Sequence, residues 1–115
     1  MARPPFAMEF HHDPRNKFRF KDSTPDDEWM ARVGAEGWVV FSHDRKWHVE
    51  LPVCAAIKQH NIACFYLAGA SFPVWDKLRC FMRGYDNIVR CINSKHAPYI
   101  YDVAINGRAT EVNIP

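Results

Sequence analysis

Apolar and polar positions along the chain alternate in patterns typical of both strands and helices. Residues 37–42 and 62–67 are continuous apolar runs of strand length, as expected for parallel strands covered on both faces. Between them, residues 50–60 place apolar side chains at roughly helical spacing, which predicts a helix that crosses from one strand to the next. A second long helix is predicted over about residues 73–92, although Gly84 interrupts its pattern.

The two ends of the chain have different patterns. Residues 5–12 alternate as a short strand does, and residues 13–25 are polar and contain two prolines, which predicts a loop. Near the C-terminus, residues 99–105 and 109–114 alternate on either side of Asn106-Gly107. That dipeptide is typical of a type I′ turn, so a hairpin is predicted.

A helix is also predicted just after the N-terminal loop. Thr24 and Pro25 followed by the acidic run Asp26-Asp27-Glu28 are typical of a helix start, because a hydroxyl caps the first turn and carboxylates favour its dipole. Gly34 or Gly37 is expected to end this helix. Together the elements predict one α/β domain over residues 1–115: three layers, with a mostly parallel sheet, helices on both faces and a C-terminal hairpin.

Composition narrows the class of protein. Of the 115 residues, 48% are hydrophobic and 24% charged, which is typical of a folded domain, and the net charge of +2 does not by itself indicate nucleic-acid binding. We expect a cytoplasmic protein, because no signal peptide and no apolar run of about 20 residues is visible. The four cysteines lie in apolar segments without a CxxC pair, so buried free thiols are predicted rather than disulfides or zinc ligands.

Polar residues follow the predicted strands at the point where each strand ends. Asp44, Arg45 and Lys46 come just after the strand over 37–42, and the acidic helix start at residues 26–28 should return to the same edge of the sheet. Carboxylates that converge there would need a cation between them, and oxygen ligands suit Mg²⁺ or Mn²⁺. Such an ion activates water for phosphodiester hydrolysis, which indicates a nuclease.

Basic residues surround this edge and could hold a nucleic-acid backbone. They are Arg45 and Lys46 after the strand, and Arg15, Lys17, Arg19 and Lys21 in the N-terminal loop.

Each of these residues also has a simpler interpretation. Asp26 or Asp27 can act only as a helix cap, Asp44 can make an Asx-turn, and the basic loop can simply be solvated. Trp47 and Trp75 are expected to pack in the interior rather than to stack on bases. A transition-metal site built from His11, His43 and Asp44 is a further alternative, although His11 and His12 should point to opposite faces of their strand.

Two segments of the sequence resemble the PIN-like domains of prokaryotes, which are similar to toxin-type ribonucleases. The first is the acidic helix start followed by Gly37-Trp38-Val39, a strand, and Ser42-His43-Asp44-Arg45-Lys46, where the family has Thr-Arg-Asp-Lys or a close variant. The second is the strand ending in Phe65-Tyr66-Leu67. The resemblance covers residues 6–112, including the strand pair around Asn106-Gly107.

The resemblance implies a site and partners. It implies metal ligation by Asp44 and by one acidic residue of the helix start, with Asp26 the first choice, Glu28 the second and Asp27 the third. It also implies RNA as substrate, an antitoxin-like protein as partner, and phosphate contacts from Lys46.

The chain also departs from the family pattern. PIN-like domains normally open with a central strand that carries an aspartate, and we expect that strand, its helix and its aspartate to be missing here. Loss of the strand would remove one metal ligand and leave unpaired strand edges. A shortened start of the chain, a rearranged sheet, or pairing with a second copy or another chain would each account for the gap, and among partners a homo-oligomer is expected. The function indicated is a Mg²⁺- or Mn²⁺-dependent ribonuclease that the lost ligand could inactivate. The alternative is a non-catalytic module that binds a partner or self-associates.

Overall fold

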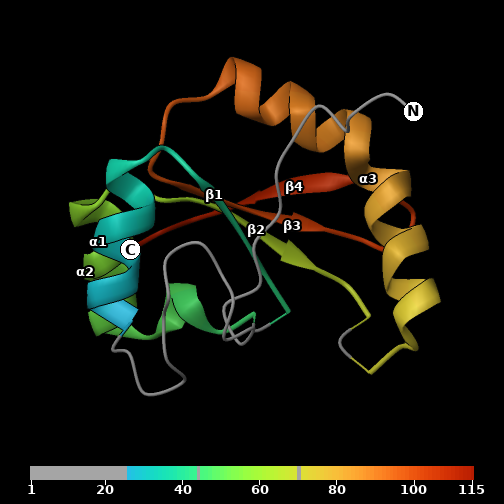
Figure 1. Ribbon diagram of the computed structural model, residues 1–115, viewed down its shortest axis with the longest axis horizontal. Coiled ribbons are helices and arrows are strands. Elements are labelled where there is room, and N and C mark those ends of the chain that lie inside the picture. The colour runs from blue at the N-terminus through green and yellow to red at the C-terminus, as the bar shows by residue number, and fades with distance from the viewer. Residues whose placement is uncertain (1–25, 44, 70) are drawn as a thin grey trace.

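The computed structural model describes residues 26–43, 45–69 and 71–115, with the backbone alone for Asp26 and Asp27. Its elements in chain order are α1 (Asp26–Ala35), β1 (Val39–Ser42), the short 3-10 helix η1 (Trp47–Val49), α2 (Leu51–Gln59), β2 (Ala63–Leu67), α3 (Val74–Ser94), β3 (Tyr99–Val103) and β4 (Ala109–Val112) (Figure 1). The strand predicted over residues 5–12 and the loop over 13–25 lie outside the described residues.

The described strands form one sheet in the order β1-β2-β3-β4. The first three strands are parallel, with Val40 beside Cys64 and Cys64 beside Ile100, and β4 is antiparallel to β3. Parallel neighbours require a crossover connection, which α2 and α3 supply. The predicted mostly parallel α/β sheet with a C-terminal hairpin is confirmed.

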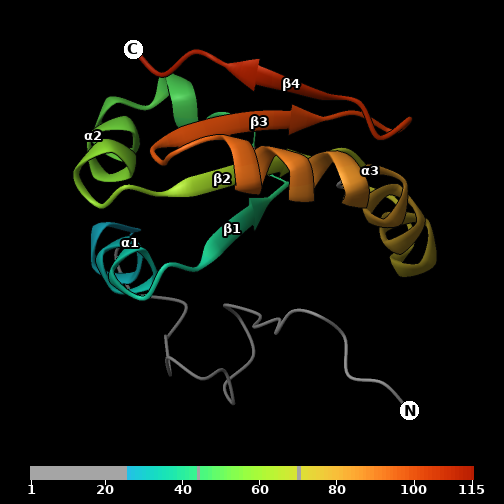
Figure 2. The ribbon, with the colours of Figure 1, turned by 90° about the horizontal axis from the view of Figure 1, so that it is seen from above.

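Helices cover both faces of the sheet. Met30 of α1 and Ile57 of α2 are fully buried in one apolar cluster, which includes Cys64 of β2. On the opposite face, Phe81 of α3 packs in a second cluster with Phe65 of β2. Alternate residues of β2 therefore enter different clusters, as the period of a strand requires. Figure 2 shows the resulting three layers, with α1 and α2 on one side of the sheet and α3 on the other.

Positive backbone φ angles mark the points where two helices turn into strands. Gly37 has a φ of 74° after α1, and its neighbour Trp38 donates a backbone hydrogen bond to Val33 O at 3.0 Å. Asn61 has a φ of 53° after α2, and Ile62 donates in the same way to Ile57 O. Both ends are Schellman motifs, which satisfy the last carbonyls of a helix. Of the two glycines expected to end α1, Gly37 does so.

The turn of the C-terminal hairpin differs from the predicted type I′ turn. A type I′ turn needs a positive φ at both central residues, but in this loop only Gly107 has one, at 89°. Gly107 N donates to Ala104 O, and Ala104 N donates to Arg108 O, the pattern of a three-residue loop that ends in a left-handed residue. This shape brings Gly107 against α3, where a Cβ atom would lie 2.4 Å from Arg83 O.

The prediction of buried free thiols is confirmed for three of the four cysteines. All four are unpaired; Cys54, Cys64 and Cys80 are buried, and Cys91 is partly exposed. Burial raises the pKa of Cys64 to about 12. At pH 8 only on the order of one Cys64 thiol in 10,000 would therefore be the reactive thiolate.

We expect iodoacetamide to alkylate Cys91 well before Cys64 in native protein, as measured by peptide mass spectrometry. In guanidinium chloride the two rates should become similar. Equal rates in native protein would contradict the burial of Cys64.

Candidate functional site

The carboxyl ends of the three parallel strands meet at one edge of the sheet. Ser42, the last residue of β1, lies beside Tyr66, and Tyr66 lies beside Asp102 of β3. The segments that follow β1 and β2 must therefore start at this edge. In open α/β sheets this is the edge where ligands bind.

The first turn of α1 lies close to the segment that follows β1. Trp29 of α1 and Trp47 of η1 pack with their ring centroids 5.8 Å apart. Because η1 begins directly after Lys46, this contact places the first turn of α1 beside the segment that leads from β1 to α2. The interior role predicted for Trp47 is confirmed, since it packs against the core on the α1 and α2 face.

The structure describes the proposed ligands to different extents. Asp26 and Asp27 form the first turn of α1, but only their backbone is described, whereas the side chain of Glu28 is exposed. Asp44 lies outside the described residues, as do Arg15 and Lys17 of the basic loop. The predicted sharing of one cation by Asp26 and Asp44 stays a prediction.

An ion pair joins the segment after β1 to the end of β3. Arg45 Nη2 lies 2.9 Å from Asp102 Oδ1 and also donates a long hydrogen bond of 3.5 Å to Val103 O. The side chains of Arg45 and Asp102 are 43% and 35% exposed, so water still reaches the pair. Arg45, predicted to contact phosphate, is thus held across the carboxyl edge of the sheet.

Asp102 is an acidic residue of this edge that was not predicted from the sequence. The predicted site used only the residues after the first strands, and the C-terminal segment was assigned to a hairpin. The signal was a single carboxylate in the otherwise apolar and aromatic run Tyr99-Ile100-Tyr101-Asp102-Val103. Once β3 is recognised as a third parallel strand, Asp102 falls at the same edge as Ser42.

Two histidines connect the segment after β1 to β2 through hydrogen bonds. His43 Nδ1 lies 3.1 Å from Leu67 O, and the backbone N–H of His48 donates to the Tyr66 hydroxyl at 2.9 Å. Among residues 26–43, 45–69 and 71–115, no three histidine, cysteine or acidic side chains gather as a metal site would require. The other members of the zinc alternative, His11 and Asp44, lie outside these ranges.

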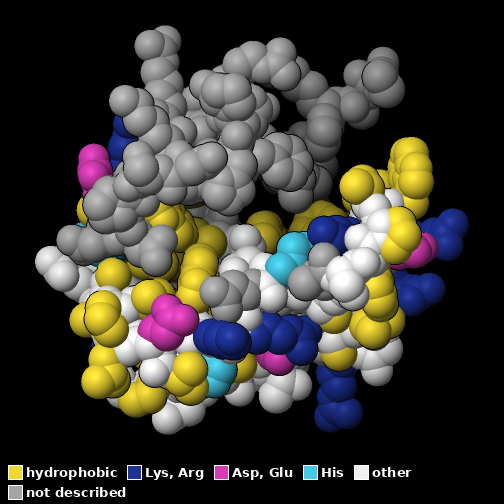
Figure 3. All heavy atoms as spheres, turned by 90° about the horizontal axis from the view of Figure 1, so that it is seen from below, with side chains coloured by type: hydrophobic (Ala, Val, Ile, Leu, Met, Phe, Trp, Pro, Cys, Tyr) yellow, Lys and Arg dark blue, Asp and Glu magenta, His cyan; other side chains and the backbone are white. Residues whose placement is uncertain are grey.

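Charged side chains are concentrated on this part of the surface. Seen from below the view of Figure 1, lysine and arginine side chains form a band next to acidic and histidine side chains (Figure 3). Arg45 and Lys46 are both exposed. Because the net charge of the chain is only +2, any attraction for an anionic ligand must come from such local clusters.

A double-mutant cycle can measure the pair across the edge. With Arg45→Gln and Asp102→Asn, we expect a coupling of about 0.2–1 kcal/mol in the free energy of unfolding, because partly exposed pairs are screened by water. The Asp76–Arg79 pair is the matched control. Its contact is longer, at 3.6 Å, and its side chains are more exposed: 47% for Asp76 and 73% for Arg79. Its coupling should be smaller. A coupling for Arg45–Asp102 that is no larger, or that is unchanged in 1 M NaCl, would contradict the described geometry.

Comparison with known proteins gives one match. A family model described as a PIN like domain matches residues 7–69, which is more than half of the chain. The chain therefore belongs to the PIN-like domain family, a family of the nuclease-type superfamily. No curated protein and no solved structure matches the chain.

The described helices include none that is both long enough and apolar enough to cross a membrane.

Proposed function

We propose that this protein is a divalent-cation-dependent ribonuclease of the PIN-like, toxin-type class. The observation that supports the proposal most is the family match over residues 7–69, because that region contains both the acidic helix start and Asp44. The Trp29–Trp47 contact adds to it, since it lies between the first turn of α1 and the segment that follows β1.

The proposed donors fit a hard cation. Asp44 and Asp26, with Glu28 and then Asp27 as substitutes, offer carboxylate oxygens, which Mg²⁺ and Mn²⁺ prefer over the ring nitrogens or thiolates that suit zinc. When bound, the ion would lower the pKa of a water molecule and offset the charge that develops on the phosphate. The exposure of Glu28 is compatible with a ligand that retains water.

The remaining steps fall to basic side chains of the same edge. Arg45 is already oriented by Asp102, so its guanidinium can donate to a phosphate oxygen with little loss of side-chain freedom. Lys46, next along the chain, can add a second positive charge for the RNA backbone. Arg15 and Lys17 of the basic loop are proposed to extend this contact.

A cleavage assay tests the proposal. Purified protein is incubated with single-stranded and with structured RNA over a series of Mn²⁺ and Mg²⁺ concentrations, and fragments are resolved on a gel. We expect cleavage that depends on the added ion and stops with EDTA. If both RNAs stay intact at every ion concentration, the ribonuclease proposal is wrong.

One observation favours a second function, that of a non-catalytic module. Within the described residues β1 pairs with β2 on one side only, and its apolar residues Val39, Val40 and Phe41 are half-buried, whereas the central residues of the inner strand β2 are fully buried. An edge of this kind can pair with a strand of another chain, such as a second copy or an antitoxin-like protein. Light scattering coupled to gel filtration distinguishes the two cases: a strict monomer that cleaves RNA supports the enzyme, and a stable oligomer without cleavage supports the module.

A further inference from the structure

Helix α3 carries a second apolar stripe in addition to the one that it buries. Its inner face packs Phe81 and Ile88 against the sheet. On another face Trp75, Leu78 and Met82 are 73%, 46% and 60% exposed. The interior role predicted for Trp75 is therefore wrong, because the tryptophan lies on the surface. Single exposed apolar residues are common, but a stripe at helical spacing is typical of a binding surface.

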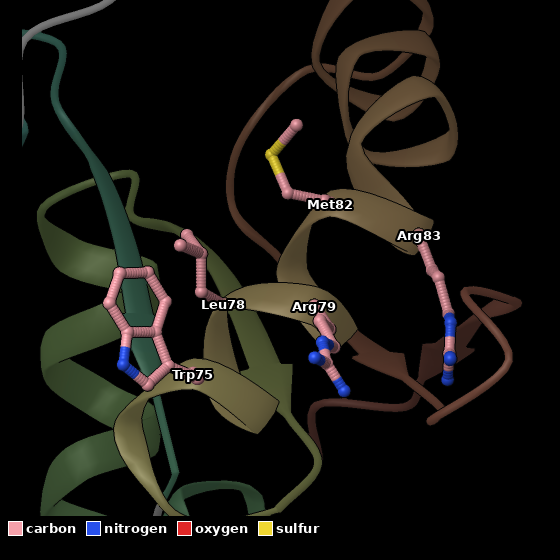
Figure 4. Close-up of a pocket in the computed structure, with 5 residues that line it drawn as sticks. All are labelled: Trp75, Leu78, Arg79, Met82 and Arg83. Atoms are coloured by element: carbon pink, nitrogen blue, oxygen red, sulfur yellow. The ribbon is translucent and has the colours of Figure 1, made fainter.

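The stripe lines a pocket together with two arginines. The pocket has a volume of about 360 Å³, and its lining residues are Trp75, Leu78, Arg79, Met82 and Arg83 (Figure 4). Arg79 and Arg83 are one helical turn apart, about 6 Å along the axis. Figure 4 shows both arginine side chains extending in the same direction from successive turns, whereas the Trp75 indole extends from the first turn toward the other side of the view. The side chain of Arg79 is 73% exposed.

This surface adjoins the candidate site. The segment that links β2 to α3 places the first turn of the helix beyond the carboxyl end of β2 (Figure 1). Farther along α3, a Cβ atom on Gly84 would lie 2.7 Å from Val103 Cγ1, so the backbone of this turn of the helix comes close to the end of β3. Arg45 reaches the same residue from the segment after β1 through its hydrogen bond to Val103 O. The backbone of α3 at Gly84 and the side chain of Arg45 thus both lie against Val103.

We propose that the α3 surface formed by Trp75, Arg79 and Arg83 binds single-stranded RNA and directs the strand toward the carboxyl edge of the sheet. This inference rests on the proposed function and assigns a path to its substrate. The Trp75 indole stacks on a base, while the two guanidinium groups bind neighbouring phosphates. Leu78 and Met82 provide the apolar wall of the base pocket.

Two features favour RNA over a folded protein partner. The exposed stripe spans only about two turns of one helix, whereas a stable protein interface buries roughly 800 Å² on each partner. The two arginines are also among the residues that line the pocket. This placement suits a nucleic-acid strand, because each of its nucleotides carries one negatively charged phosphate.

Binding is measured apart from cleavage. A fluorescein-labelled 12-nucleotide oligouridine is titrated with the protein in EDTA, and its fluorescence anisotropy gives the affinity. We expect Trp75→Ala to weaken binding about 5- to 150-fold, the range for loss of one stacked base. Trp75→Phe should recover part of the affinity. The log of the affinity decreases as the log of the salt concentration rises. For Arg79→Gln combined with Arg83→Gln, this slope should become shallower by about 1.4, because each single-strand phosphate contact contributes about 0.7 to its magnitude.

Control variants remove similar groups elsewhere. Arg32→Gln removes an exposed arginine from α1, and Leu51→Ala removes an apolar side chain that is 74% exposed at the start of α2. Both should bind the oligonucleotide as the unaltered protein does. Circular dichroism should show that all variants keep their helix content, since every altered side chain is exposed.

Three results would overturn the inference. The unaltered protein could fail to bind the oligouridine, the α3 variants could bind as tightly as the controls, or they could change the mass of the protein in light scattering while leaving RNA affinity unchanged. The last result would assign the stripe to a protein partner.

Asp44→Asn separates the inference from the proposed function, because this variant should still bind RNA in EDTA. If the unaltered protein cleaves no RNA at any ion concentration, the proposed function fails, whereas the α3 assignment is decided by the binding data alone.

Discussion

Replacing Asp44 with asparagine is expected to reduce Mn²⁺-dependent RNA cleavage by about 100-fold or more. The amide keeps the size of the side chain but loses the negative charge that would hold the cation. Stabilisation of phosphate charge by a metal ion is worth several kcal/mol, and about 2.7 kcal/mol already corresponds to 100-fold in rate. The measurement is the initial cleavage rate of a labelled RNA at saturating Mn²⁺, for the unaltered and the altered protein.

Glu36→Gln provides the matched control for the loss of one carboxylate. Glu36 lies just beyond the end of α1, away from the edge where β1 ends, and its side chain is exposed and 3.9 Å from Arg32. This variant should cleave at the normal rate. Asp26→Asn should resemble Asp44→Asn, with smaller effects from Glu28→Gln and Asp27→Asn. Normal cleavage by Asp44→Asn would remove Asp44 from the site.

Replacing Phe65 with alanine is expected to destabilise the fold by about 3–5 kcal/mol, the usual range for a large aromatic residue removed from a core. The Phe65 side chain is fully buried at the centre of the sheet. Its ring packs against Phe41, Tyr99 and Tyr101, with centroids 5.7, 5.7 and 5.8 Å away. Because these partners come from β1 and β3, the cavity would weaken contacts across three strands. Urea unfolding monitored by circular dichroism measures the change.

Trp75→Ala is the control for this variant. The indole is 73% exposed, so its removal should change the free energy of unfolding by no more than about 0.5 kcal/mol. The same experiment thus establishes that the RNA-binding variant is folded. A loss below 1 kcal/mol for Phe65→Ala would contradict the central position of that ring.

The order and type of the elements could be predicted because their signals are local. Two apolar runs of strand length, separated by a helix-length amphipathic segment, predicted the parallel pair β1 and β2. The positive φ that ends α1 could be assigned to Gly34 or Gly37, the glycines near the end of its apolar pattern. The 3-10 helix η1 gave no such signal, because three residues are too few for a periodic pattern.

Features that depend on tertiary contacts were predicted less well. The hairpin has a three-residue loop instead of the predicted type I′ turn, and this loop lets Gly107 pack against α3. The dipeptide Asn106-Gly107 alone does not reveal that contact. Trp75 was assigned to the interior because aromatic residues usually pack there, whereas α3 already buries another face. The Arg45–Asp102 pair joins residues that are remote in sequence, and only the strand order places them at one edge.

Crystals soaked in Mn²⁺ and measured for anomalous scattering test most directly whether residues 26 and 44 form a metal site. The proposal predicts an anomalous peak beyond the carboxyl end of β1, with carboxylate oxygens of Asp44 and Asp26 about 2.0–2.6 Å from the ion, the range for hard divalent cations. Carboxylates of these two residues on opposite sides of the molecule, or a manganese ion bound only elsewhere, would contradict it.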